Sequence, residues 1–85
     1  MTAAERWQDC SLAVTRLYQV IDAGSINTGW LLTSAANRFR AAGCMDLAER
    51  CDSMAEDWGA PDSDVRALID DAAVRCGEFE RETLE

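Results

Sequence analysis

The chain has 85 residues and a mass of 9.4 kDa, enough for one small domain with a single hydrophobic core. It contains 16 acidic residues, eight basic residues that are all arginine, and no histidine, so its formal net charge is −8. This acidity argues against direct binding to nucleic acid or to an anionic membrane. Histidine and lysine, the usual general bases, are absent, and histidine is also the commonest metal ligand. We therefore expect no enzyme activity, cofactor or metal site.

The first predicted helix begins after Thr2, which forms a capping-box pattern with Glu5, and it ends at Gly24. Leu12 and Val20 lie off its main apolar stripe. The stripe itself recurs at steps of 3, 4, 3, 1 and 3 residues and consists of Trp7, Cys10, Val14, Leu17, Tyr18 and Ile21. These residues predict one buried face.

The second predicted helix covers about residues 28–42 and is ended by Gly43. Its buried stripe consists of Leu31, Leu32, Ala35, Phe39 and Ala42, whereas Trp30 lies off the stripe. Asp46 and Glu49 have the spacing of another capping box, and they predict a third helix that extends to about Trp58. The apolar face of the third helix consists of Leu47, Cys51, Met54, Ala55 and Trp58.

The last predicted helix follows a break at Gly59 and Pro61 and has the most regular pattern. Its stripe consists of Val65, Leu68, Ile69, Ala72, Cys76 and Phe79, with Val74 on the opposite side. Four short helices with short connections predict an all-α fold, a small antiparallel bundle of about four helices that forms a single domain over residues 1–85. We expect Trp7 and Trp58 to belong to its core.

The N-terminal segment is charged, and no apolar run approaches the roughly 20 residues that a membrane span needs. We therefore expect a soluble, cytoplasmic protein. Its cysteines are Cys10, Cys44, Cys51 and Cys76, separated by 34, 7 and 25 residues. Each lies on a predicted apolar helix face, which favours reduced thiols in the core. Disulfides and a four-cysteine zinc site remain the alternatives.

The negative charge is confined to one half of the chain. Residues 1–45 carry a net charge of +1, and residues 46–85 carry −9. On the last helix, an acidic stripe about 20 Å long lies within about 60° around the axis and consists of Asp71, Glu78, Glu82 and Glu85. Such a stripe can be a solvated face that keeps a small domain soluble. It can also place carboxylates where a basic groove expects phosphates.

A compact, acidic helical chain with arginine but no lysine resembles the small inhibitors that phages encode against bacterial nucleic-acid machinery, the anti-CRISPR proteins among them. Size, charge and the lack of catalytic residues carry this resemblance. It implies a chain that binds a protein and occupies a nucleic-acid site on it. Other proteins of this class block subunit contacts or cause dimerisation.

We therefore expect a protein-binding inhibitor whose acidic face occupies a basic, nucleic-acid-binding site of its target. Trp30 would add an apolar contact, because tryptophan is enriched at interface hot spots. The residues expected to bind the partner are Asp52, Glu56, Asp57, Asp70, Asp71, Glu78, Glu82, Glu85 and Trp30. The alternative is a structural, assembly or adaptor protein that forms a homodimer or docks through exposed apolar residues.

Overall fold

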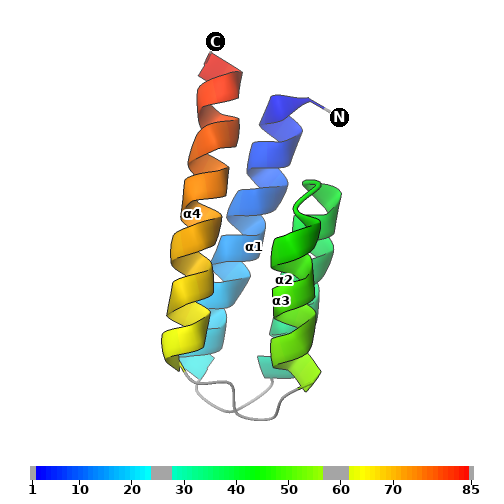
Figure 1. The fold of residues 1–85 in the computed structure, drawn as a ribbon, viewed down its shortest axis with the longest axis vertical. Coiled ribbons are helices and arrows are strands. Elements are labelled where there is room, and N and C mark those ends of the chain that lie inside the picture. Colours follow the sequence, from blue (N-terminus) through cyan, green and yellow to red (C-terminus); the bar gives the residue numbers. More distant parts are fainter. Residues whose placement is uncertain (1, 24–27, 57–61, 85) are drawn as a thin grey trace.

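The computed structural model describes residues 2–23, 28–56 and 62–84. These residues form four helices: α1 (Ala3–Ala23), α2 (Thr28–Ala41), α3 (Met45–Glu56) and α4 (Asp62–Leu84). Successive helices run in opposite directions, and both chain ends lie at the same end of the molecule (Figure 1). The prediction of an all-α antiparallel bundle is confirmed. No helix in the described ranges is long and apolar enough to cross a bilayer.

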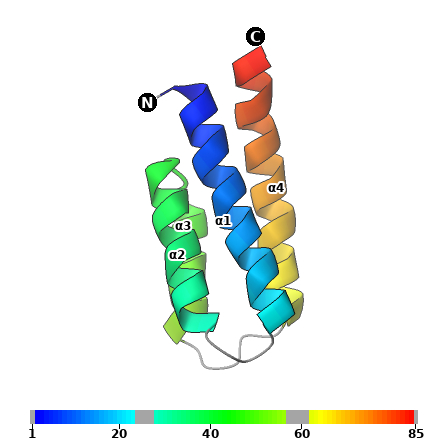
Figure 2. The ribbon, with the colours of Figure 1, turned by 180° about the vertical axis from the view of Figure 1, so that it is seen from behind.

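Helix α1 organises the bundle. It packs against α2 on one side and α4 on the other, α2 packs against α3, and α3 approaches α4 at only a few points. Figure 2 shows α1 and α4 side by side, with their outer ends extending past the α2–α3 turn, as they also do in Figure 1. The bundle is 41 Å long and 18 by 17 Å across.

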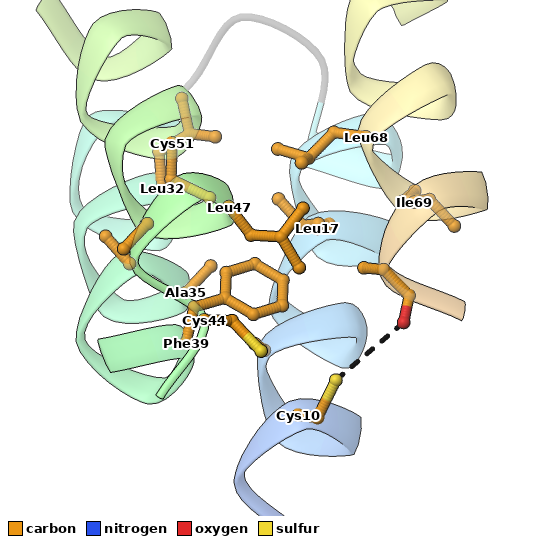
Figure 3. Packing of buried hydrophobic residues seen from close by; sticks show 14 of the residues in the cluster. Cys10, Leu17, Leu32, Ala35, Phe39, Cys44, Leu47, Cys51, Leu68 and Ile69 are labelled. Carbon is orange, nitrogen blue, oxygen red and sulfur yellow. Dashed lines mark hydrogen bonds between the residues drawn. The ribbon is translucent and has the colours of Figure 1, made fainter. Parts of the chain in front are cut away.

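One core runs along the bundle and draws side chains from all four helices (Figure 3). Its largest fully buried members are Phe39, Leu17, Leu47, Leu68 and Val65. Alanines at Ala13, Ala35 and Ala72 are also fully buried, and their small side chains let the helices approach closely. Among the described residues no polar or charged side chain is buried, so the specificity of packing comes from shape and from contacts at the bundle surface.

The predicted capping box at the start of α1 is present. The backbone N–H of Glu5 donates to Oγ1 of Thr2 at 3.2 Å, and the Thr2 hydroxyl donates to the Glu5 carboxylate at 3.3 Å. The N–H of Arg6 donates to the Thr2 carbonyl oxygen at 3.1 Å. The first contact satisfies the N–H of Glu5, which has no partner within the helix, and the bond from Arg6 is the first regular hydrogen bond of α1.

The α2–α3 turn closes on Gly43, whose φ is +83°. The N–H of Gly43 donates to the carbonyl oxygen of Arg40 at 3.0 Å, and that of Cys44 donates to Phe39 at 2.8 Å. This pair of bonds is a Schellman motif, in which the left-handed residue is usually glycine. Cys44 then accepts the first α3 bond from Ala48 at 3.0 Å. Gly43 therefore ends α2, and the next residue, Cys44, begins α3.

Arg6 joins three parts of the bundle at this turn. Its Nε donates to the carbonyl oxygen of Ala42 at 3.0 Å, which satisfies a group left free by the end of α2. Its guanidinium also lies 4.3 Å from the centre of the Phe79 ring of α4, a cation–π distance. The sequence offered no sign of this role, because Arg6 and its two partners, Ala42 and Phe79, are far apart along the chain.

The predicted start of α3 is two residues late. The helix begins at Met45, so Asp46 lies in its first turn and is not the cap; its carboxylate accepts hydrogen bonds from Arg75 of α4 at 2.7 and 3.4 Å. Cys44 occupies the capping position because the Schellman motif fixes its backbone there. Helix α3 ends at Glu56, and Trp58 lies outside the described residues.

The predicted buried face of α1 is rotated relative to the observed one. Its buried residues are Cys10, Ala13, Leu17 and Val20, whereas Trp7 is 37% exposed and Tyr18 is 54% exposed. The placements of Trp7 and Tyr18 in the core and of Val20 outside it are therefore wrong. The fully buried Ala13 lies within the observed face, and a pattern weighted by large side chains misses that small residue. Leu12, Trp30 and Val74 are exposed, as predicted.

Two of the cysteines are joined, so the prediction of four reduced thiols is wrong for them. Cys10 of α1 and Cys76 of α4 form a disulfide with a Cα–Cα distance of 5.6 Å. The sequence placed both on inner helix faces but could not give the level at which α1 and α4 meet. Cys44 and Cys51 are free and buried, as expected. The Cys10 sulfur also lies 3.7 Å from the Ala72 carbonyl oxygen, to which a reduced thiol would donate (Figure 3).

We expect two glycine-to-alanine substitutions to have opposite effects on stability. Gly43→Ala should lower the free energy of unfolding by about 1 kcal/mol, because an L-residue is strained at positive φ. The control Gly77→Ala should raise it by up to about 1 kcal/mol, since a Cβ there meets no atom within 4 Å and Gly77 lies inside α4. Urea denaturation measures both, and equal signs would contradict this reading of the turn.

Reduction should destabilise the fold, because the Cys10–Cys76 disulfide closes a sequence separation of 66 residues. The expected loss is roughly 2–4 kcal/mol in the free energy of unfolding. Thiol titration of the denatured, unreduced protein should find two free groups, and reduction should raise the number to four. A Cys10→Ala/Cys76→Ala variant should match the reduced protein and show no further response to reductant. Four thiols before reduction would contradict the disulfide.

Candidate protein-binding surface

The acidic stripe of α4 lies on the flank of the helix that faces α3. This orientation follows from two ion pairs across the α3–α4 seam. Arg50 of α3 donates to Asp71 at 2.7 Å, and Arg75 of α4 donates to Asp46 of α3 at 2.7 Å. Because α3 and α4 have few close backbone approaches, these surface ion pairs provide much of the direct contact between the two helices.

The seam fixes the charge state of Asp46. The hydrogen bond from Arg75, followed by the attraction of its positive charge, holds the pKa of the Asp46 carboxyl below its usual value. The same hydrogen bond raises the pKa of Arg75. Asp46 stabilises the fold above the ordinary pKa of an aspartate, and this contribution is lost as the pH falls through the lowered value. Both side chains are more than one-third exposed, so the contribution is small.

Glu78 and Glu82 occupy the outer part of the stripe. Arg75 is level with Asp46, in the first turn of α3, so Glu78 and Glu82 lie beyond the start of α3 on the projecting end of α4 (Figure 1). Both are exposed, and neither forms an ion pair with another described residue. Glu85, the last member of the predicted stripe, lies outside the described residues.

The other predicted acidic residues do not join this stripe into one patch. Asp52 faces α2, where it forms an ion pair with Arg40, and Glu56 is exposed at the last position of α3. Asp70 is exposed about 100° around α4 from Asp71, which points it away from the α3 flank. Asp57 lies outside the described residues.

Trp30 lies in a separate place. It is 57% exposed on α2, and the guanidinium of Arg16 from α1 is 5.8 Å from the centre of its ring. Arg38 of α2 pairs with Asp9 of α1 at 3.3 Å on this same side of α2. Trp30 therefore belongs to the α1–α2 surface and not to the α3–α4 seam. The predicted combination of one tryptophan and one acidic face is divided between two surfaces.

The free cysteines lie inside the protein and are poor nucleophiles. Burial raises the pKa of the Cys51 thiol to about 12, and burial also raises that of Cys44, against the opposing effect of nearby Arg75. Both thiols are therefore protonated at neutral pH. Among the described residues no group of three or more cysteine or acidic side chains is placed to hold a metal ion.

These thiols should make the fold less stable at alkaline pH. In the unfolded chain a cysteine loses its proton near pH 8.5–9, whereas Cys51 and Cys44 resist ionisation in the folded state. The folded state binds protons more tightly, so stability should be complete below about pH 8 and fall as the pH rises from 9 to 11. Urea denaturation at several pH values measures this fall. A Cys44→Ala/Cys51→Ala variant should show a flatter profile, and an unchanged slope would contradict the assignment.

Comparison with known proteins identifies no relative, so the functional proposal rests on the acidic surface of α4 described above. No protein-family model, curated protein or solved structure matches this chain.

Proposed function

We propose that this protein is an inhibitor that binds a basic, nucleic-acid-binding surface of a target complex through the acidic, projecting end of α4. The observation that carries this proposal is the position of Glu78 and Glu82. They are exposed beyond the start of α3 and have no arginine partner among the described residues. Asp71 and Asp52, by contrast, are held in ion pairs within the bundle.

Two features make this end suitable for a basic groove. Glu78 and Glu82 are one helical turn apart, about 6 Å along the axis, so their carboxylates project from one flank of a rigid element. Residues 46–85 also carry a net charge of −9, which attracts a positively charged partner from a distance and speeds encounter. In this mechanism the inhibitor competes with phosphate groups for the same arginine and lysine side chains of the target.

A second candidate function is assembly through apolar contacts, and the exposed aromatic side chains favour it. Trp30 is exposed beside Arg16 on the α1–α2 surface, which is separate from the acidic end. An apolar contact of this kind persists at high salt, whereas attraction between exposed charges is screened. Trp30→Ala would weaken such an assembly and leave binding through the acidic end unchanged.

The test compares two charge reversals of equal size. Glu78→Arg/Glu82→Arg should abolish capture of the target from a lysate of the source organism, because it replaces the two carboxylates of the acidic stripe on the projecting end of α4. The control Asp22→Arg/Glu49→Arg changes the net charge equally but alters exposed positions on α1 and α3. Asp71 is left intact, since its reversal would place two arginines together at the α3–α4 seam.

Support requires three results together: the captured complex binds DNA or RNA, added nucleic acid displaces the inhibitor, and binding weakens steeply as salt rises. Binding that survives high salt and both charge reversals, but fails with Trp30→Ala, would replace the inhibitor proposal with the assembly function. Equal loss of binding in both charge-reversal variants would show that overall charge matters and the end of α4 does not.

A further inference from the structure

The outer face of the α1–α4 pair carries apolar side chains that the bundle leaves uncovered. Trp7 and Tyr18 of α1 are exposed, and Val14 and Ile21 are partly buried at the edge of the core. With Ser11, they recur at steps of four and three residues, the spacing of a coiled-coil seam. Within the bundle, the buried line of α1 is Cys10, Ala13, Leu17 and Val20. Only Val14 and Ile21 of the seam reach the edge of the core, and Trp7 and Tyr18 remain exposed.

Helix α4 contributes a matching line to the same face. Asp71 and Arg75 occupy the flank of α4 that faces α3, and the opposite flank contains Arg66, Ala73 and Glu80. These three residues are seven positions apart, two helical turns each time, and all are exposed. Neither Arg66 nor Glu80 forms an ion pair with another described residue.

The two lines are in register. The Cys10–Cys76 disulfide and the contact of Arg6 with Phe79 fix the level at which the antiparallel helices meet. They place Val14 level with Asp71 and Ala72, so Ala73 lies within two residues of the same level, near the midpoint of the face. On the two sides of this midpoint, apolar residues occupy equivalent positions of α1, and charges of opposite sign occupy equivalent positions of α4. Trp7 and Ile21 lie seven residues on either side of Val14, and Arg66 and Glu80 lie seven residues on either side of Ala73.

We propose that this face binds a second copy of the chain, with α1 against α1 and α4 against α4, each pair antiparallel about a two-fold axis. A two-fold axis through the midpoint brings Val14 against its own copy and Trp7 against Ile21 of the second copy. It also brings Arg66 opposite Glu80 of the second copy, twice. A face whose charges complement themselves under a two-fold operation is what an isologous dimer requires.

The size and charge of the face agree with this occupant. The whole bundle measures 41 by 18 Å, so a face that covers one side of it has a projected area of at most about 700 Å², near the roughly 800 Å² that each partner contributes to a stable complex. The α1 seam contains no charged residue, and on α4 the charges of Arg66 and Glu80 are opposite in sign. Asp62, at the start of α4, lies on the same line as Glu80 and leaves this line with one excess negative charge. Two chains of net charge −8 can therefore meet here without bringing their acidic stripes together.

Sedimentation velocity at low ionic strength tests the dimer across a concentration series. The wild type should be dimeric at tens of micromolar. Arg66→Glu and Glu80→Arg should each raise the dissociation constant roughly tenfold or more, because each places like charges opposite one another twice. The control Glu49→Arg alters an exposed residue of α3, a helix that contributes nothing to this face, and it should leave the dissociation constant unchanged.

Recombining the two changes distinguishes this interface from any other. The Arg66→Glu/Glu80→Arg double variant should recover the wild-type dissociation constant, and an equimolar mixture of the two single variants should form a mixed dimer. Circular dichroism checks that each variant remains helical. A wild type that stays monomeric at several hundred micromolar overturns the proposal. A dimer that ignores the single variants, or folded variants that fail to recover on recombination, also overturns it.

Discussion

The antiparallel pairing of the first and last helices is the constraint on which the rest of this structure depends. Helix α1 contacts both α2 and α4, whereas α3 and α4 have few close approaches. The α2–α3 hairpin is therefore connected to α4 mainly through α1. Two contacts fix the register of the pair: the disulfide between Cys10 and Cys76, and the stacking of Arg6 on Phe79. Arg6 also binds the end of α2, so the same register sets where the α2–α3 hairpin sits.

Aspartate and glutamate occupy different positions on the surface of this protein. Each acid in an ion pair between helices is an aspartate: Asp9, Asp46, Asp52 and Asp71 among the described residues. The short aspartate side chain holds its carboxylate close to the helix, where an arginine from the neighbouring helix can reach it. The longer glutamates of α4, including Glu78 and Glu82, extend into solvent. The acidic residues therefore divide into those held in ion pairs within the bundle and those that extend into solvent.

Local patterns in the sequence predicted much of the fold. Capping at Thr2, the helix stop at Gly43 and the stripe of α4 needed only neighbouring residues, and all three are observed. What failed depended on relations between helices. The observed buried face of α1 includes the small residue Ala13, which the pattern of large apolar residues missed, and the partners of Arg6, Cys10 and Asp71 come from other helices. The sequence identified the acidic residues of the candidate surface, but only the packing separates those held in ion pairs from those free to bind.

The position of the disulfide has a mechanical consequence. It joins α1 and α4 toward the end of the bundle where both termini lie (Figure 1), and the two cysteines have a sequence separation of 66. A force applied to the two termini is carried across the sulfur–sulfur bond and bypasses α2 and α3 entirely. A protease that unfolds its substrates by pulling on the chain meets a covalent loop when it reaches Cys10 or Cys76. To continue, it must thread two chain segments at once, so oxidation would protect the protein from degradation independently of its thermodynamic stability.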